Sequence, residues 1–238
     1  MLKPLLAGAA VVRASSSGAC AMAADRLRGA LWGLFAGDAL ASPTHWYYGG
    51  SYQIEADYGG PLTGYAKPRP TLDGSIMPRS NTDGAGRGSY NRGKKTVIGD
   101  VINHGKKQYW DPSRSYHYHG TLSAGEETLE ASLARVLMRT VSESGGLVNA
   151  EAFRGAYVNF MTKPGSHNDS YASTAHRMFF ANWFHKKKEP VACPDNDRHN
   201  VDTIDGLVLP GVAAAVAAYK NGPGAAGREA ARAAAVDV

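Results

Sequence analysis

Asp38 is an acid that stands among hydrophobic residues in the sequence, where exposure to water is hard to expect. It falls on one helical stripe with Leu31, Leu34 and Phe35, at spacings that place all four side chains on the same face. A carboxylate on a face directed towards the core must be paired, hydrogen-bonded or bound to a metal, because burying it alone costs several kcal/mol. Two interpretations follow: Asp38 anchors the structure, or Asp38 is a metal ligand.

Two adjacent glutamates, Glu126 and Glu127, stand at the expected start of the second amphipathic helix. Ser123 and Glu126 have the spacing of a capping box, which predicts that the helix begins at Ser123 and gives Glu126 a structural role. Glu127 has no such role. Adjacent carboxylates repel each other unless a cation lies between them, and Mg²⁺ prefers oxygen ligands. From the spacing alone, exposure to solvent explains the pair equally well.

A polar turn formed by His167, Asn168 and Asp169 precedes another expected helix, which starts near Ser170. The N-terminal amides of that helix could bind a pyrophosphate, so the three residues are candidates for substrate binding. A cap on the helix, made by the Asn or the Asp side chain, explains the same residues.

Three histidines complete the set of residues that could do chemistry. His199 shares a polar face with Asp202, and on this face ligand binding and simple exposure are both open. His117 and His119 alternate as on an extended strand. Without acids or thiols at ligand spacing, we interpret these two as packing or loop residues.

Amphipathic helices must position these residues. Hydrophobic stripes predict helices from about 27 to 41, from 123 to about 140, after Asn149 to about 161, from about 170 to 182 and over 201–221, the last interrupted at Pro210. Short, Gly-bearing connections between such helices favour an all-α, multi-helix, bundle-like domain.

A long loop-rich insertion over 42–120 separates the first two helices. Its many aromatic residues favour ordered wrapping over the helices. Basic residues gather within it between Arg87 and Lys107, but no recognised nucleic-acid module accompanies them. We interpret them as a solvated loop face and expect no nucleic-acid partner.

The chain has 238 residues, 43% of them hydrophobic, and no apolar run long enough to cross a bilayer, so we expect a soluble globular protein without a membrane partner. Residues 1–24 lack acids and are rich in Ala and Ser, as is typical of a mitochondrial or plastid transit peptide. A disordered leader on a cytoplasmic protein is the alternative. The helical domain is expected over 25–221, and an Ala- and Gly-rich tail over 222–238 forms a weak helix or is disordered.

Four segments, in this order, resemble the ADP-ribosylglycohydrolase family, and specifically its crystallin-J1-like branch. They are GDALASPTHWYY, HYHGTLSAGEETLEASLARVLMR, FMTKPGSHNDSYASTAHRMFFANW and DRHNVDTIDGL. The resemblance covers about residues 25–219. It implies an all-α fold with a cleft that holds two Mg²⁺ ions, in which ADP-ribose attached to a protein or to a small molecule is hydrolysed while an acid activates water.

The resemblance also implies roles for particular residues. The family's Thr-Asp-Asp metal cluster falls on Gly125, Glu126 and Glu127, with Thr128 one position further on. The metal candidates are therefore Glu126, Glu127, Thr128 and Asp38. The family's catalytic glutamate matches His45, which makes Glu127 and His45 the catalytic candidates. His167, Asn168, Asp169 and His199 are the candidates for substrate binding.

A second metal cluster of the family has no match between Pro210 and Val238. The sequence therefore predicts a C-terminally incomplete domain, with one of two Mg²⁺ sites incomplete. Two functions stay open. The chain is a Mg²⁺-dependent glycohydrolase, as the retained acids favour, or it is a non-catalytic relative that binds a nucleotide-like ligand or is structural, as the missing acids favour. The oligomeric state stays open as well.

Overall fold

The computed structural model describes residues 5–84, 86, 95–195, 198 and 203–238. Within these ranges most residues are helical, and β-pairing is confined to two isolated bridges, Thr71 with Tyr116 and Ile98 with Ile102. The all-α fold predicted from the sequence is confirmed.

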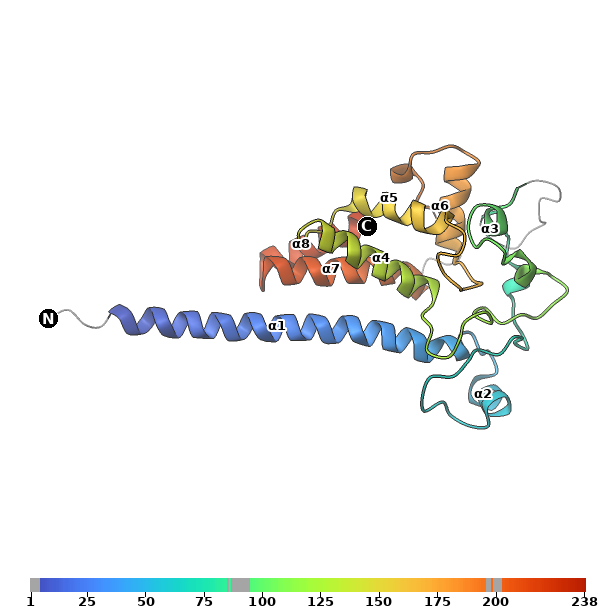
Figure 1. Cartoon of the computed structure of the whole chain (residues 1–238), viewed down its shortest axis with the longest axis horizontal. Helices are drawn as coiled ribbons and strands as arrows, with labels where there is room; N and C mark the ends of the chain where they lie inside the picture. The colour runs from blue at the N-terminus through green and yellow to red at the C-terminus, as the bar shows by residue number, and fades with distance from the viewer. Residues whose placement is uncertain (1–4, 85, 87–94, 196–197, 199–202) are drawn as a thin grey trace.

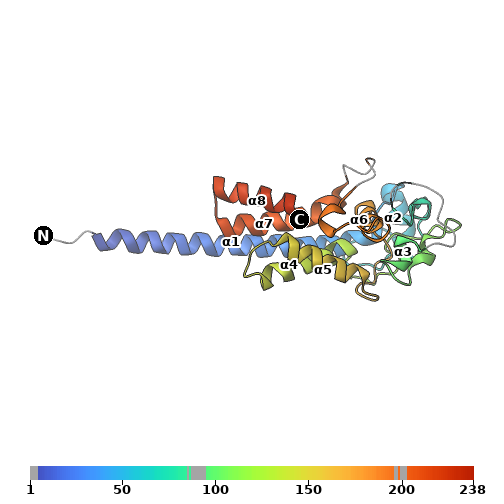
Figure 2. The same ribbon diagram turned by 90° about the horizontal axis from the view of Figure 1, so that it is seen from above.

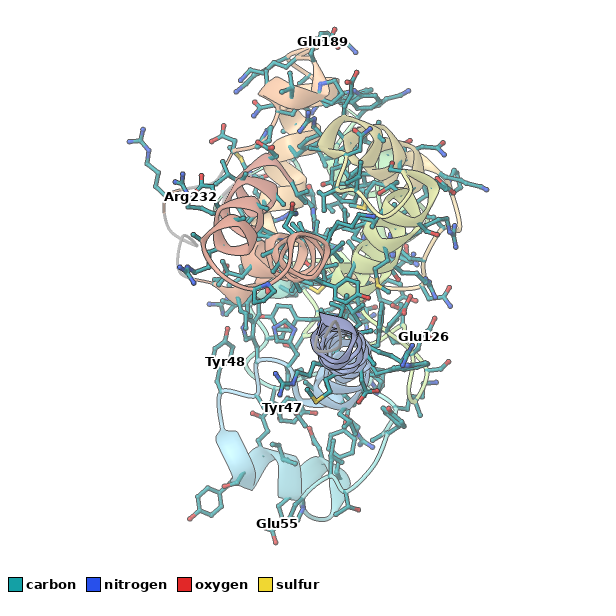
Figure 3. All side chains as sticks on the ribbon, turned by 90° about the vertical axis from the view of Figure 1, so that its left-hand side faces the viewer. Tyr47, Tyr48, Glu55, Glu126, Glu189 and Arg232 are labelled. Atoms are coloured by element: carbon teal, nitrogen blue, oxygen red, sulfur yellow. The ribbon has the colours of Figure 1, made fainter. Side chains whose placement is uncertain are left out.

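One long helix, α1, packs along α4 and α7. The elements are α1 (Leu5–Ala41), α2 (Gly50–Tyr58), α3 (Val97–Asp100), α4 (Leu129–Glu143), α5 (Ala150–Thr162), α6 (Thr174–Phe184), α7 (Val208–Asn221) and α8 (Ala225–Asp237). The N-terminal part of α1 extends beyond the other helices (Figures 1 and 2). Viewed along α1, the pair α7 and α8 lies on one side, the pair α4 and α5 on the other, and α2 beneath (Figure 3).

The core is built on α4. Its Leu129, Leu133 and Leu137 are fully buried, and the helix contacts α1, α5 and α7. These leucines recur at i and i+4, so one apolar stripe faces the neighbouring helices over the whole helix. The hydrophobic pattern read from the sequence therefore identifies the central helix of the fold.

The start of α4 differs from the prediction. The helix begins at Leu129, with Thr128 at its N-cap, and not at Ser123. Gly125 has φ of +76°, in the left-handed region, so the helix cannot extend back through it. The start of α6 is also later than predicted, at Thr174 instead of near Ser170.

Two further differences lie in α2 and α7. Helix α2 falls in the stretch predicted to be loop, and among its residues none is buried, so it carries no apolar stripe that the sequence could reveal. Pro210 does not interrupt α7 but stands in its first turn, where a missing backbone N–H leaves no hydrogen bond broken. The other described residues of the insertion wrap the helices as expected, with Trp110 and Tyr118 fully buried.

The two ends of the chain are helical in the described residues. The tail predicted as a weak helix or disorder forms α8, which packs against α7 and buries Ala234. Helix α1 begins inside the predicted leader, and the targeting role of residues 1–24 stays a prediction. Among the helices described, none combines the length and the apolar character that a membrane span needs.

Replacing Leu133 by Ala should lower the free energy of unfolding by about 2–5 kcal/mol, because a fully buried side chain would leave a cavity in the core. Urea denaturation followed by circular dichroism measures the change. Leu147→Ala is the matched control: Leu147 is 58% exposed, and its truncation should change stability by less than about 0.5 kcal/mol. Equal effects of the two substitutions would contradict the central position of α4.

Candidate functional site

Two aspartates from distant parts of the chain accept backbone N–H groups at the start of α4. Asp38 in α1 accepts the N–H of Thr128 through Oδ2 at 2.7 Å and the Thr128 hydroxyl through Oδ1 at 2.6 Å. Asp169 accepts the N–H of Leu129 through Oδ2 at 2.8 Å. Both carboxylates satisfy donors that have no partner inside the helix, at the positive end of its dipole. The structure therefore gives Asp38 and Asp169 an anchoring role.

The two carboxylates differ in their pKa. Burial raises the pKa of Asp38, and the two hydrogen bonds from Thr128 offset part of this shift. Burial alone would also raise the pKa of Asp169, but the charge and hydrogen bond of His119 and the N–H groups of Leu129 and Tyr171 bring it below its ordinary value. Of these two carboxylates, Asp169 is thus the one held more firmly in its ionised form.

A line of hydrogen bonds leads from Asp169 to His45. The Nδ1 of His119 lies 2.9 and 3.0 Å from the two carboxylate oxygens of Asp169, and its Nε2 lies 2.6 Å from Nδ1 of His45. Burial acts to lower the pKa of His119, but the charge and hydrogen bond of Asp169 and the charges of Glu130 and Asp38 together outweigh it, and the pKa is raised. Burial and the charge of His119 lower the pKa of His45 to about 3.

These pKa directions define the protons along the line. A protonated His119 donates from Nδ1 to Asp169 and from Nε2 to His45, so neutral His45 carries its own proton on Nε2. His45 then presents a donor at its far nitrogen. It can act as a base at that nitrogen only after the proton on Nε2 has left.

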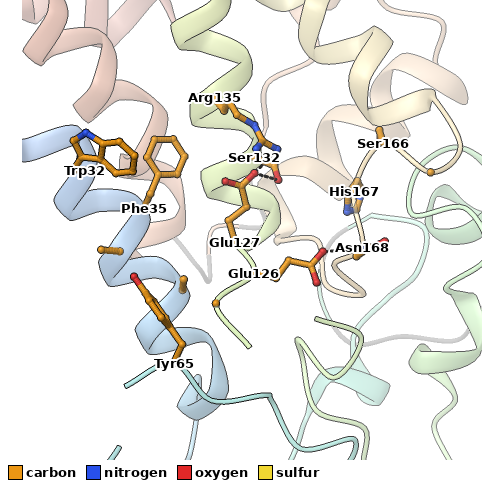
Figure 4. A pocket seen from close by; sticks show the side chains of 14 residues that line it. Trp32, Phe35, Tyr65, Glu126, Glu127, Ser132, Arg135, Ser166, His167 and Asn168 are labelled. Carbon is orange, nitrogen blue, oxygen red and sulfur yellow. Dashed lines mark hydrogen bonds and ion pairs between the residues drawn. The ribbon is translucent and has the colours of Figure 1, made fainter. Parts of the chain in front are cut away.

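A half-open pocket of about 520 Å³ lies beside the start of α4 (Figure 4). Helix α1, the loop before α4 and the loop after α5 form its walls. Its lining includes Trp32, Phe35, Tyr65, Glu126, Glu127, Ser132, Arg135, Ser166, His167 and Asn168. Asp38, His45, Thr128 and Asp169 do not line it. Some of the candidate residues therefore line this pocket, whereas the others take part in the hydrogen bonds at and near the start of α4.

The side chains of Glu126 and Glu127 turn to different partners (Figure 4). Glu127 Oε1 accepts the hydroxyl of Ser132 at 2.9 Å and forms an ion pair with Arg135. Glu126 accepts the N–H of Ser123 at 2.8 Å and the side-chain amide of Asn168 at 2.6 Å. The Ser123–Glu126 contact predicted for a capping box is present, but it closes a turn ahead of the helix. The positive charge beside Glu127 is therefore the guanidinium of Arg135, a residue of the same chain.

Of the residues predicted to bind substrate, two face the pocket. His167 lines it, its buried Nδ1 has no partner in the described part of the chain, and burial together with Lys106 lowers its pKa to about 4. Asn168 lines it and holds Glu126. Asp169 points instead to α4 and His119. His199 lies outside the described residues.

Sequence reasoning missed two residues that shape the site. His119 was interpreted as a packing residue, and no signal in the sequence pairs it with Asp169, which lies 50 residues away. Arg135 follows Glu127 by eight positions, and residues with this spacing on one helix are about 12 Å apart along its axis. The spacing therefore gave no signal for the ion pair, which forms because Glu127 lies ahead of the first helical residue, Leu129.

The donors do not form a closed Mg²⁺ site in this arrangement. Mg²⁺ requires near-octahedral oxygen ligands, yet the predicted ligands do not converge on one point. Asp38 binds Thr128, whereas Glu126 and Glu127 each bind other groups of the protein. Within the described ranges, no group of three or more His, Cys, Asp or Glu side chains could hold a metal.

Comparison with known proteins identifies the class. Residues 20–237 match the family model described as ADP-ribosylglycohydrolase, and the chain therefore belongs to that family. Members of this family are glycosidic hydrolases that act on ADP-ribosylated substrates. No curated protein and no solved structure matches the chain.

Replacing His119 by Gln should flatten the dependence of stability on pH above pH 6.5. The pKa of His119 is raised above its ordinary 6.5 in the folded chain. Its stabilising contribution is then complete below that value and is lost as the pH rises through the folded pKa. Urea denaturation between about pH 6 and about pH 9 should show a falling unfolding free energy for the wild type and a flatter profile for the variant.

The control for this prediction is His104→Gln. The ring of His104 binds the neutral carbonyl of Thr162 at 3.0 Å, so its loss should leave the slope against pH in place. A His119→Gln variant with the wild-type slope would show that protonated His119 is not its source.

Proposed function

We propose that the pocket binds the ADP-ribosyl group of an ADP-ribosylated protein or of a small ADP-ribose derivative, and that the chain hydrolyses its glycosidic bond. The observation that carries this proposal is that Glu126, Glu127, His167 and Asn168 line one half-open pocket in a member of this family. The motifs quoted from the sequence support the crystallin-J1-like branch as the finer assignment.

Glu127 is the residue that we assign to water activation. Ser132 and Arg135 fix its Oε1, whereas Oε2 has no hydrogen-bond partner in the described residues. A carboxylate held on one side and open on the other can take a proton from water as the water oxygen bonds to the anomeric carbon. The bond from that carbon to the leaving group breaks with its electron pair, and the leaving group is then protonated.

The aromatic rings at the pocket support recognition of a nucleotide. Trp32 is 70% exposed and Tyr65 is 54% exposed, although both line the pocket beside Phe35. Such rings offer stacking surfaces to an adenine base, and stacking on aromatic side chains contributes about 1–3 kcal/mol per base. His167 adds a buried ring nitrogen that a ligand hydroxyl could satisfy.

A second candidate function, binding of the same ligand without hydrolysis, is favoured by the Arg135–Glu127 ion pair. The guanidinium of Arg135 and the hydroxyl of Ser132 both occupy Oε1 of Glu127, so less of this carboxylate is open to a water molecule. In this case the pocket serves recognition alone.

Glu127→Gln tests the assignment. With an ADP-ribosylated peptide as substrate, we expect release of ADP-ribose by the wild type and a loss of about 100-fold or more in the variant, as removal of a general base produces. Chromatography of released ADP-ribose measures the rate. Glu143→Gln, an exposed change on the same helix, is the matched control and should keep the wild-type rate.

Calorimetry with free ADP-ribose separates the two candidates. Binding without release of ADP-ribose by the wild type would establish the non-catalytic function and reject hydrolysis. Absence of both binding and release would reject both functions.

The Mg²⁺ requirement implied by the resemblance is a proposal with its own test. Because Arg135 and Ser132 hold Glu127, we expect the wild type to bind Mg²⁺ weakly. Arg135→Gln removes the competing charge and should raise the affinity by about tenfold or more, the effect of one charge-assisted contact. Titration with Mn²⁺, followed by paramagnetic resonance, measures this binding without reference to activity.

The control for the metal test is Arg139→Gln, the same change one helical turn further along α4, which should leave Mn²⁺ affinity as in the wild type. Equal affinities of the Arg135→Gln variant and the wild type would contradict a Mg²⁺ site at Glu127.

A further inference from the structure

A second and larger cavity, of about 740 Å³, lies away from the proposed ADP-ribosyl pocket. It is lined by residues of α5, of the first turns of α6 and α7, of the segment between these two helices, and of the C-terminal end of α8. Phe153, Tyr157 and Phe179 form an aromatic wall, and each of these side chains is less than one-tenth exposed. The two cavities share no lining residue.

Ser173 places an unsatisfied hydroxyl at this cavity. It occupies the N-cap of α6, but its side chain makes no cap hydrogen bond, and its Oγ has no partner among the described residues. The residue is 3% exposed. Buried polar atoms in native proteins are nearly always hydrogen-bonded, so an orphaned hydroxyl that lines a cavity indicates a missing partner.

His176, less than one turn along α6, lines the same cavity and is also incompletely satisfied. Its Nδ1 shares a hydrogen bond of 2.8 Å with the Tyr157 hydroxyl, whereas its Nε2 is 3.4 Å from Oε1 of Glu130 and makes no hydrogen bond in the described part of the chain. The ring of His176 therefore donates no short hydrogen bond to Glu130.

The charge around the cavity is predominantly negative. Asp195, Asp205 and Asp237 line it, whereas Arg154 is the single Lys or Arg among the described lining residues, and its guanidinium donates to the backbone carbonyl of Asp237. Burial and the nearby charge of Glu130 raise the pKa of Asp205 to about 6. Asp205 is thus a partly buried carboxylate without a cationic partner in the described residues.

We propose that this cavity is a binding site for a small organic cation with an apolar body, such as a primary amine. The ammonium head would lie between the Asp205 carboxylate and the Ser173 hydroxyl, both of which accept hydrogen bonds. The apolar body would pack on Phe153 and Phe179. The faces of these rings would also attract the ammonium group beside them. This site is independent of the proposed hydrolysis of ADP-ribosyl groups.

Three probes of the same shape and different charge test the site on the full chain. Phenethylammonium, neutral phenethyl alcohol and anionic phenylacetate are titrated into the protein and followed by saturation-transfer NMR. We expect the ammonium to bind and phenylacetate not to bind, with the alcohol weaker than the ammonium by about tenfold, because it lacks the charge-assisted contact.

Asp205→Asn should weaken binding of the ammonium by about tenfold or more, and Ser173→Ala by about threefold. Asp25→Asn, the same change at an exposed position on α1, is the matched control and should keep the wild-type affinity. Circular dichroism of each variant shows that it is folded, and Ser173→Ala carries the test should Asp205→Asn not fold. Equal binding of the three probes, binding of none, or full affinity in both cavity variants would overturn the proposal.

Discussion

The start of α4 is the point on which the rest of the structure depends. Asp38 and Asp169 accept the N–H groups of two successive residues, Thr128 and Leu129, and thereby fix α1, α4 and the segment after α5 in one arrangement. Each carboxylate lies at the positive end of the helix dipole, so attraction offsets part of the energetic penalty of its burial. The proposed ADP-ribosyl pocket exists because the loop before α4 and the loop after α5 are held on either side of this point.

The same anchor explains why the acids of the site have separate roles. Asp169 accepts from α4 and from His119 at once, which leaves it fully satisfied and away from the pocket. Glu127, just ahead of the helix, has one oxygen held by Ser132 and Arg135 and faces the pocket instead. An acid that is completely hydrogen-bonded maintains structure, whereas an acid with an open oxygen is available for chemistry.

Periodicity predicted the main helices well because each buries an apolar stripe, and α4 is the clearest case. Periodicity could not predict α2, which buries no residue, or the start of α4, where a left-handed Gly125 overrides the capping box. For the site, the sequence identified Asp38 as an acid that needs a partner, but spacing cannot show that the partner is Thr128, 90 residues away. His119 and Arg135 were missed or left unassigned for the same reason: their roles arise only from tertiary contacts.

The sequence separation of these anchoring contacts bears on how the chain folds. Thr128 and Asp38 are 90 residues apart, and Leu129 and Asp169 are 40 residues apart. Closing loops of such length carries an entropic penalty that must be met before the contacts stabilise anything. The middle of α4 can form early through local hydrogen bonds, but its first turn is completed only when the segments that carry Asp38 and Asp169 have packed against it. The central helix of this protein is therefore finished late at the very end that borders the pocket.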